Sequence, residues 1–201
     1  MKRIFILLCG LLALASPLSA YKVLYAEQWY KLVHRHLYQD PDRVMENIRY
    51  LEEALKADFA NPLNAMARIS NKTQWERYRY LFYTQVNLTM VEQHIVLAKS
   101  FDKMFAYFYN YPWKSANLKS LEQAEKVYEF TKYYWEKAKE WSAKANEPRF
   151  QFLYLPEVQF WIDQSHRIET GDLNYGQILN KHLTRLRRVR EDFEAMDKTT
   201  Y

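Results

Sequence analysis

One long segment, from Trp75 to Tyr109, constrains the fold of this 201-residue chain more than any other. Its apolar side chains recur at helical spacing on two separate stripes. The first stripe consists of Leu81, Thr84, Leu88, Val91, Ile95 and Ala98, and the second of Phe82, Val86, Met90, Leu97 and Phe101. A helix on the surface of a domain carries one apolar stripe, so two stripes require neighbours on both sides. The sequence therefore predicts a central helix in a layered array of helices.

Polar residues divide the two stripes along both edges of this helix. Gln85, Glu92 and Lys99 lie on one edge, and Glu76, Asn87 and His94 lie on the other. Thr73 and Glu76 have the spacing of a capping box, which predicts that the helix starts there. Pro112 pushes Tyr111 out of the helical region, so we expect the helix to loosen near Tyr109.

Proline pairs divide the part of the chain before the central helix. Residues 21–38 form the first predicted helix, and Asp40-Pro41 ends it and caps a second helix that runs to Ala57. Asn61-Pro62 repeats this device and predicts a short helix that ends at Ile69.

Similar signals delimit the helices after the central one. Ser120 and Gln123 form a second capping box, which predicts a helix over 121–145. Pro156 opens a helix that Gly171 ends as its C-terminal cap, and Asp172 is predicted to cap the last helix. No segment alternates for long enough to require a β-sheet, so the predicted class is all-α.

The first twenty residues have the features of a secretory signal peptide. Lys2 and Arg3 precede an apolar run over 4–15, and the small residue Ala20 precedes the expected cleavage point. We therefore expect a periplasmic protein with residues 21–197 as a single all-helical domain and 198–201 as a frayed tail. An uncleaved anchor and a lipidated Cys9 are the alternatives, although the run is short for a membrane span of about 20 residues.

Composition excludes several classes of function. Cys9 is the only cysteine, so the chain beyond the leader has neither a disulfide nor a catalytic thiol. Three glycines are too few for phosphate-cradling loops. The net charge of +5, two units of which come from Lys2 and Arg3, is too small to indicate nucleic acid.

The sequence offers no convincing catalytic or metal-binding motif. His34 and His36 are the most metal-like pair, but on a helix their side chains point about 200° apart. No His-Glu-x-x-His motif and no glycine-flanked serine is present. His182 falls on an apolar stripe and is expected in the core. We predict no catalytic residues, no metal and no cofactor, and hence a protein that is not an enzyme.

Two groups of residues are candidates for binding a partner. The first is aromatic and consists of Tyr107, Tyr109, Tyr111 and Trp113, which cannot all point into one core. The second is basic and consists of Lys181, Arg185 and Arg188, on the face of the last helix opposite Leu179 and Leu186. The basic face suits an acidic protein or an anionic membrane surface. Core packing of the aromatic group and ordinary solvation of the basic group are the alternatives.

One segment resembles a known helical repeat. Residues 51–62, Leu-Glu-Glu-Ala-Leu-Lys-Ala-Asp-Phe-Ala-Asn-Pro, resemble the end of a tetratricopeptide repeat. Trp29 and Leu32 have that family's Trp-x-x-Leu spacing, and Gly171-Asp172-Leu173 resembles its inter-helix turn. The resemblance implies tetratricopeptide-like helical hairpins stacked as a short α-solenoid, with an irregular helical bundle as the alternative.

An exported, tyrosine-rich helical chain of this kind is also similar in style to small periplasmic repeat proteins of spirochaetes. Some of those proteins scaffold the collar of the periplasmic flagellar motor. This resemblance implies a non-enzymatic periplasmic scaffold or adaptor, whose partners are proteins of an envelope or flagellar assembly. The alternative is a periplasmic ligand-binding module for a glycan, a peptidoglycan fragment or a lipid. The sequence does not specify an oligomeric state.

Overall fold

The computed structural model describes residues 22–103 and 110–199. The expected signal peptide over residues 1–20 and its cleavage site after Ala20 lie outside these residues. Within them, six α-helices and four short 3-10 turns are present and there is no strand, which confirms the all-α class. None of the described helices is long and apolar enough to span a membrane.

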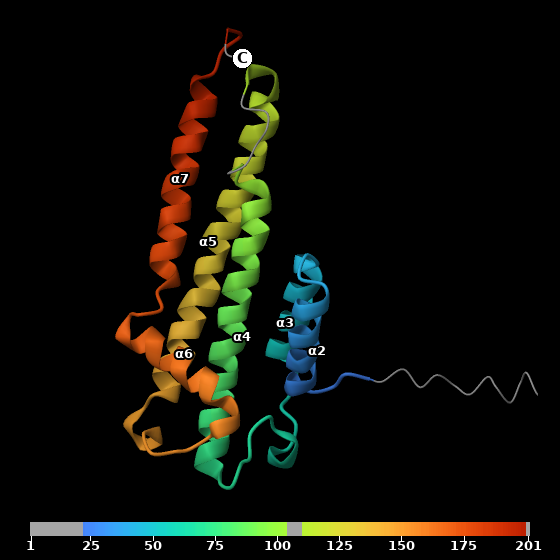
Figure 1. Cartoon of the computed structure of the whole chain (residues 1–201), viewed down its shortest axis with the longest axis vertical. Coiled ribbons are helices and arrows are strands. Elements are labelled where there is room, and N and C mark those ends of the chain that lie inside the picture. Colours follow the sequence, from blue (N-terminus) through green and yellow to red (C-terminus); the bar gives the residue numbers. More distant parts are fainter. Residues whose placement is uncertain (1–21, 104–109, 200–201) are drawn as a thin grey trace, which may run out of the picture.

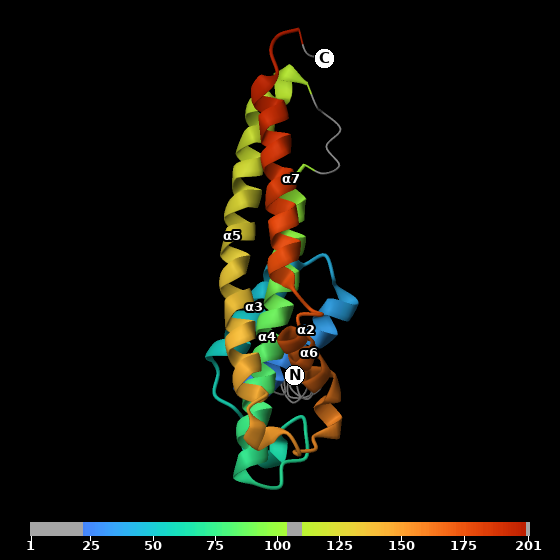
Figure 2. The ribbon, with the colours of Figure 1, turned by 90° about the vertical axis from the view of Figure 1, so that its left-hand side faces the viewer.

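Two long helices form the body of the molecule. α4 (Lys72–Phe101) and α5 (Lys114–Ala145) pack side by side, and α7 (Tyr175–Ala195) lies along α5 (Figures 1 and 2). The hairpin of α2 (Ala26–Gln39) and α3 (Val44–Lys56) stands on the other side of α4 (Figure 1). α6 (Gln159–Thr170) crosses α4 and α5 near their lower ends in that view.

The burial of α4 confirms the prediction of a central helix with two apolar stripes. Leu81, Leu88 and Val91 of the first stripe are buried, as are Phe82, Val86 and Met90 of the second. Three polar residues between the stripes, Gln85, Asn87 and His94, are buried as well. α4 packs against α3, α5 and α6, so neighbours cover it on several sides.

Aromatic rings join the α2–α3 hairpin to the body. Phe59, just after α3, meets Phe82 edge to face at 5.1 Å between ring centroids. Tyr78 of α4 stacks on Trp75 at 5.4 Å and contacts Trp161 of α6 at 5.8 Å. Offset and edge-to-face contacts of this kind add to the stabilisation that ring burial provides. Much of the aromatic content therefore lies in the core.

The predicted helix starts before α4 are corrected by the structure. α2 begins at Ala26 rather than at residue 21. Asp40 ends α2, because its φ of −135° and ψ of 61° lie outside the helical region, and α3 begins only at Val44, with Arg43 rather than Asp40 as its N-terminal cap residue. The helix expected from Asn61-Pro62 to Ile69 is wrong, since the structure has a single 3-10 turn at Pro62–Asn64.

Other corrections concern the ends of the long helices. Asn71 caps α4 by accepting a hydrogen bond from the Gln74 N–H (2.9 Å), so Thr73 lies inside the helix. α4 ends at Phe101, before the predicted end at Tyr109. α5 begins at Lys114, seven residues before the predicted Leu121, and the Ser120 hydroxyl donates to the Phe101 carbonyl oxygen (2.9 Å).

The C-terminal part follows the prediction more closely. A 3-10 turn at Pro156–Val158 leads into α6, and Gly171 ends α6 with a φ of 83°. Glycine adopts this left-handed conformation without steric cost. Asn174, rather than Asp172, caps α7 by accepting from the Gln177 N–H (3.1 Å).

Candidate functional site

The three predicted cations of α7 lie on one face. Lys181, Arg185 and Arg188 line a shallow depression of about 350 Å³ together with Asn180 and Thr184. Lys181 and Arg188 are exposed. The guanidinium of Arg185 instead pairs with the fully buried carboxylate of Asp102, which also accepts a hydrogen bond from the Tyr128 hydroxyl (2.8 Å). Arg185 therefore joins α7 to the end of α4, and this use competes with its predicted role as a surface cation.

His182 belongs to the same neighbourhood. Its ring stacks on Tyr128 with 5.0 Å between centroids and 7° between the planes. Burial lowers the pKa of His182, and the positive charges of Lys99 and Arg185 lower it further. The expected core histidine is thus half-buried against an aromatic ring.

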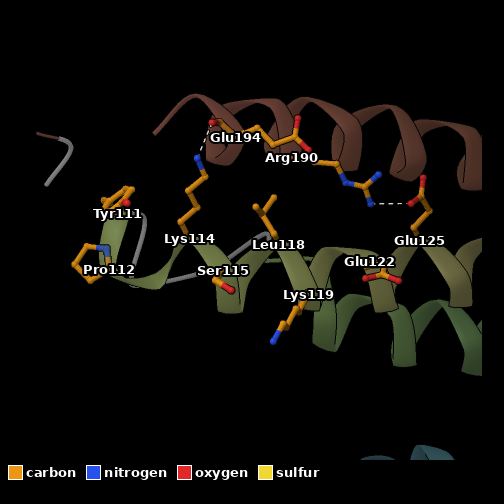
Figure 3. A pocket seen from close by; sticks show the side chains of 10 residues that line it. All are labelled: Tyr111, Pro112, Lys114, Ser115, Leu118, Lys119, Glu122, Glu125, Arg190 and Glu194. Atoms are coloured by element: carbon orange, nitrogen blue, oxygen red, sulfur yellow. Dashed lines mark hydrogen bonds and ion pairs between the residues drawn. The ribbon is translucent and has the colours of Figure 1, made fainter. Parts of the chain in front are cut away.

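The described part of the predicted aromatic group lies at the opposite end of α7. Tyr107 and Tyr109 fall outside the described residues, and Tyr111 and Trp113 form the 3-10 turn before α5. Tyr111 lines a wide cleft of about 700 Å³ between the start of α5 and the end of α7 (Figure 3). Trp113 is half exposed and is not among the lining residues.

Ion pairs and hydrogen bonds already connect the two walls of this cleft. Figure 3 shows Lys114 reaching across to α7, where its Nζ donates to the carbonyl oxygens of Glu194 (2.7 Å) and Met196 (3.0 Å). Arg190 of α7 pairs with Glu125 of α5 at 2.7 Å. The cleft is therefore cross-linked by its own charged side chains, which makes it a poor receptor for a charged partner.

A second groove lies between α3 and α5, and residues of α4 also line it. We call it the α3–α5 groove. It has a volume of about 460 Å³ and is lined by Glu52, Leu55, Lys56, Tyr83, Asn87, Tyr133, Tyr134, Lys137 and Trp141. Trp141 stacks on Tyr83, with 4.7 Å between centroids. The exposed ring of Tyr133, which lines the groove, stacks on the exposed ring of Phe130 beside it, with 6.2 Å between centroids and 10° between the planes. Aromatic side chains thus form its wall and its floor.

The rim of the α3–α5 groove carries both signs of charge. Lys56 pairs with Glu53 at 3.5 Å, and Lys137 pairs with Glu140 at 2.8 Å. Lys137 and Lys144 lower the pKa of Glu140 to about 2. Tyr134 is buried at the floor, and this burial raises its pKa to about 12. Charges at the rim around an apolar floor are typical of the arrangement at protein interfaces.

A third hollow, which we call the α2–α6 cleft, lies where α2, α4 and α6 meet. Its volume is about 410 Å³, within the range of small-molecule sites. Its apolar lining consists of Val33, Leu37, Met66, Leu88, Phe160 and Trp161. Tyr30, Gln85 and Thr89 add buried polar groups, while Lys31, Glu92 and Glu157 are exposed.

Sequence reasoning missed both the α3–α5 groove and the α2–α6 cleft. One available signal was the polar edge of α4, since Gln85 and Glu92 both line the α2–α6 cleft. Within the described residues, no three His, Cys, Asp or Glu side chains are grouped so as to hold a metal ion.

A family model described as a domain of unknown function, DUF8513, matches residues 73–196. This span takes in α4 to α7 and leaves out the α2–α3 hairpin. No curated protein and no solved structure matches the chain. The α3–α5 groove and the α2–α6 cleft both lie where the hairpin meets the matched part, so each is formed by the two parts together.

Proposed function

The chain belongs to the DUF8513 family, and we propose that it is a non-enzymatic adaptor that seats a partner protein in the α3–α5 groove. The observation that carries this proposal is the stacked pair of Phe130 and Tyr133, which are 52% and 54% exposed. Rings of this size are strongly stabilised by burial. A stacked pair beside a hollow offers a preformed anchor that a partner can cover.

The shape of the groove supports a helical partner. α3 and α5 each pack on α4, and the groove runs between them. A third helix fits such a slot by placing apolar residues over Leu55, Tyr134 and Trp141. The charged residues at the rim, Glu52, Lys56 and Lys137, would then orient the partner more than they hold it.

The leader-like residues 1–20 support an exported setting for this adaptor, within an envelope-associated or flagellar assembly. Residues 21–201 contain no cysteine, so an exported protein with this sequence would keep its fold without disulfides.

A site-specific photo-crosslinker tests the proposal. The crosslinking residue is placed at Tyr133 in one variant and at Tyr38, 90% exposed on α2, in another. We expect one envelope protein to be captured in stoichiometric amount from Tyr133 and not from Tyr38. We also expect purified partner to lose binding to the Phe130→Ala, Tyr133→Ala double variant while the circular dichroism of that variant stays unchanged.

Two results would overturn the adaptor proposal. One is equal capture from Tyr133 and Tyr38, because equal capture would mean that the crosslinks report random encounters and not binding at a specific site. The other is undiminished binding of the captured protein to the folded double variant.

A further inference from the structure

The α2–α6 cleft is separate from the α3–α5 groove, and its polar groups carry a second, independent inference. Tyr30, Gln85 and Thr89 line the cleft with at most 9% of each residue exposed, and none carries a formal charge. The charged lining residues, Lys31, Glu92 and Glu157, are exposed at the mouth. A molecule in the cleft therefore meets apolar and neutral polar groups inside and charges only at the entrance.

The carboxamide of Gln85 is the polar group with the least satisfied hydrogen bonding. Its Nε2 donates to the Thr89 hydroxyl at 3.4 Å, and its Oε1 has no hydrogen-bond partner among the described residues. The Thr89 hydroxyl uses its own proton on the Gln85 main-chain oxygen (3.0 Å), so the Thr89 oxygen can only accept from Nε2. This network places Nε2 toward Thr89 and leaves Oε1 as the unpaired atom.

A buried acceptor without a donor is costly, and a ligand that supplies the donor removes that cost. Gln85 lines the α2–α6 cleft, and a molecule bound there can supply the missing donor to its carboxamide oxygen. Among the described residues, no lysine or arginine belongs to the buried lining of the cleft, which includes Tyr30.

The surroundings of Tyr30 disfavour charge beside this residue in the cleft. Burial raises the pKa of Tyr30 to about 12, although hydrogen bonds with Trp161 and Gln85 act in the opposite direction. The same desolvation would act against the ionised head of a fatty acid or an amine placed there.

We propose that the α2–α6 cleft binds an uncharged, largely apolar small molecule that bears one hydrogen-bond donor, a hydroxyl or an N–H. Gln85 recognises the donor through Oε1. Val33, Leu37, Leu88 and Trp161 enclose the apolar part. Because the hairpin helix α2 forms one wall, the ligand also joins the hairpin to the helices of the family-matched part.

Calorimetric titration of the purified protein with three related probes tests this proposal. The probes are 1-naphthol, which is neutral and has one donor, 1-methoxynaphthalene, which lacks the donor, and 1-naphthoate, which is an anion. We expect 1-naphthol to bind at least about tenfold more tightly than either of the others.

Two variants and a matched control assign the recognition to Gln85. Gln85→Leu should bind the two neutral probes equally, whereas Gln164→Leu, at another lining position, should keep the preference for 1-naphthol. Leu37→Trp, at a partly buried wall position, should fill the cleft and abolish binding of 1-naphthol while circular dichroism stays unchanged.

Each other outcome overturns the proposal in a defined way. Equal binding of all three probes, or tighter binding of 1-naphthoate, would mean that the cleft does not select for a neutral donor. A preference that persists in Gln85→Leu would mean that another group recognises the donor. Absence of binding by every probe would mean that the cleft is not a small-molecule site.

Discussion

Arg77 of α4 donates a hydrogen bond from its Nε to the carbonyl oxygen of Ala145, the last residue of α5 (3.2 Å). Its Nη1 donates to the carbonyl oxygen of Leu153 (2.7 Å), in the connector that leads to α6. The end of a helix leaves carbonyl oxygens unpaired and carries partial negative charge, so a cation there is stabilising. Arg77 thereby fixes both the end of α5 and the approach to α6, whose Phe160 and Trp161 line the α2–α6 cleft.

Replacing Arg77 should destabilise the protein strongly. The side chain is only 6% exposed, and Arg77→Met would leave two carbonyl oxygens without their donor. We expect the free energy of unfolding to fall by about 3 kcal/mol, measured by urea titration. Arg79→Met is the matched control on the same helix. Its Nε has no hydrogen-bond partner among the described residues, so we expect a loss of less than about 1 kcal/mol. Equal losses in the two variants would argue against the capping role of Arg77.

The cations of α7 should separate into two functional groups. Arg185→Met would leave the buried carboxylate of Asp102 without its guanidinium, so we expect a loss of about 3 kcal/mol in unfolding free energy. Lys181→Met and Arg188→Met alter exposed side chains and should change stability by less than about 0.5 kcal/mol. Any binding of anionic vesicles should therefore be lost in the Lys181, Arg188 double variant without a change in urea midpoint. A large loss of stability in either single variant would contradict this division.

The two glycines near α7 should respond differently to alanine. Gly171→Ala places a Cβ in open space but keeps a φ of 83°, so we expect a loss of about 1 kcal/mol that comes from the backbone alone. Gly176→Ala has no such backbone cost, but its Cβ would lie 3.2 Å from the Trp135 Nε1. Asparagine tolerates the left-handed conformation, so Gly171→Asn should retain more stability than Gly171→Ala. Thermal unfolding of Gly171→Asn and Gly171→Ala checks this order, and equal stability of these two variants would contradict it.

Local signals in the sequence predicted the buried faces of the helices better than their first residues, since Asn71 and Asn174 cap α4 and α7 in place of Thr73 and Asp172. The two stripes of α4 and the end of α6 at Gly171 depend on spacing and on backbone conformation, and the structure confirms both. The capping box at Ser120 failed because its hydroxyl donates to Phe101, a residue of another helix. A capping pattern alone does not reveal such a tertiary hydrogen bond.

The hollows of the molecule were harder to predict than its helices. The α2–α6 cleft joins Tyr30, Gln85 and Trp161, which are far apart in the chain and come from three helices. The sequence placed Gln85 on a polar edge between two apolar stripes, and that edge faces the cleft. Its burial follows from the positions of α2 and α6, which periodicity within α4 does not determine. Arg185 was likewise predicted as a surface cation, because the sequence of α7 does not show that its partner, Asp102, lies just after the end of α4.

His94 occupies a buried position in α4 that links stability to pH. Its Nδ1 donates to the Met90 carbonyl oxygen (2.8 Å), and its ring contacts Tyr134 at 5.0 Å and Phe130 at 5.5 Å. Burial lowers the pKa of His94 below its ordinary value of 6.5, against the opposing effects of the Met90 hydrogen bond and the charge of Glu52. The imidazole therefore stays neutral in the folded protein at a pH where it is already protonated in the unfolded chain.

The unfolded state thus binds more protons than the folded state as the pH falls through 6.5, so the free energy of unfolding should decrease on acidification. One such group contributes a slope of at most about 1.4 kcal/mol per pH unit. Urea titrations between pH 7.5 and 5.5 should show a flatter dependence for His94→Gln than for the unmodified protein, because glutamine does not titrate. His166→Gln, at an exposed position on α6, should keep the original slope. An unchanged slope in His94→Gln would assign the pH dependence to other groups, of which half-buried His182, whose pKa is also lowered, is the first to substitute.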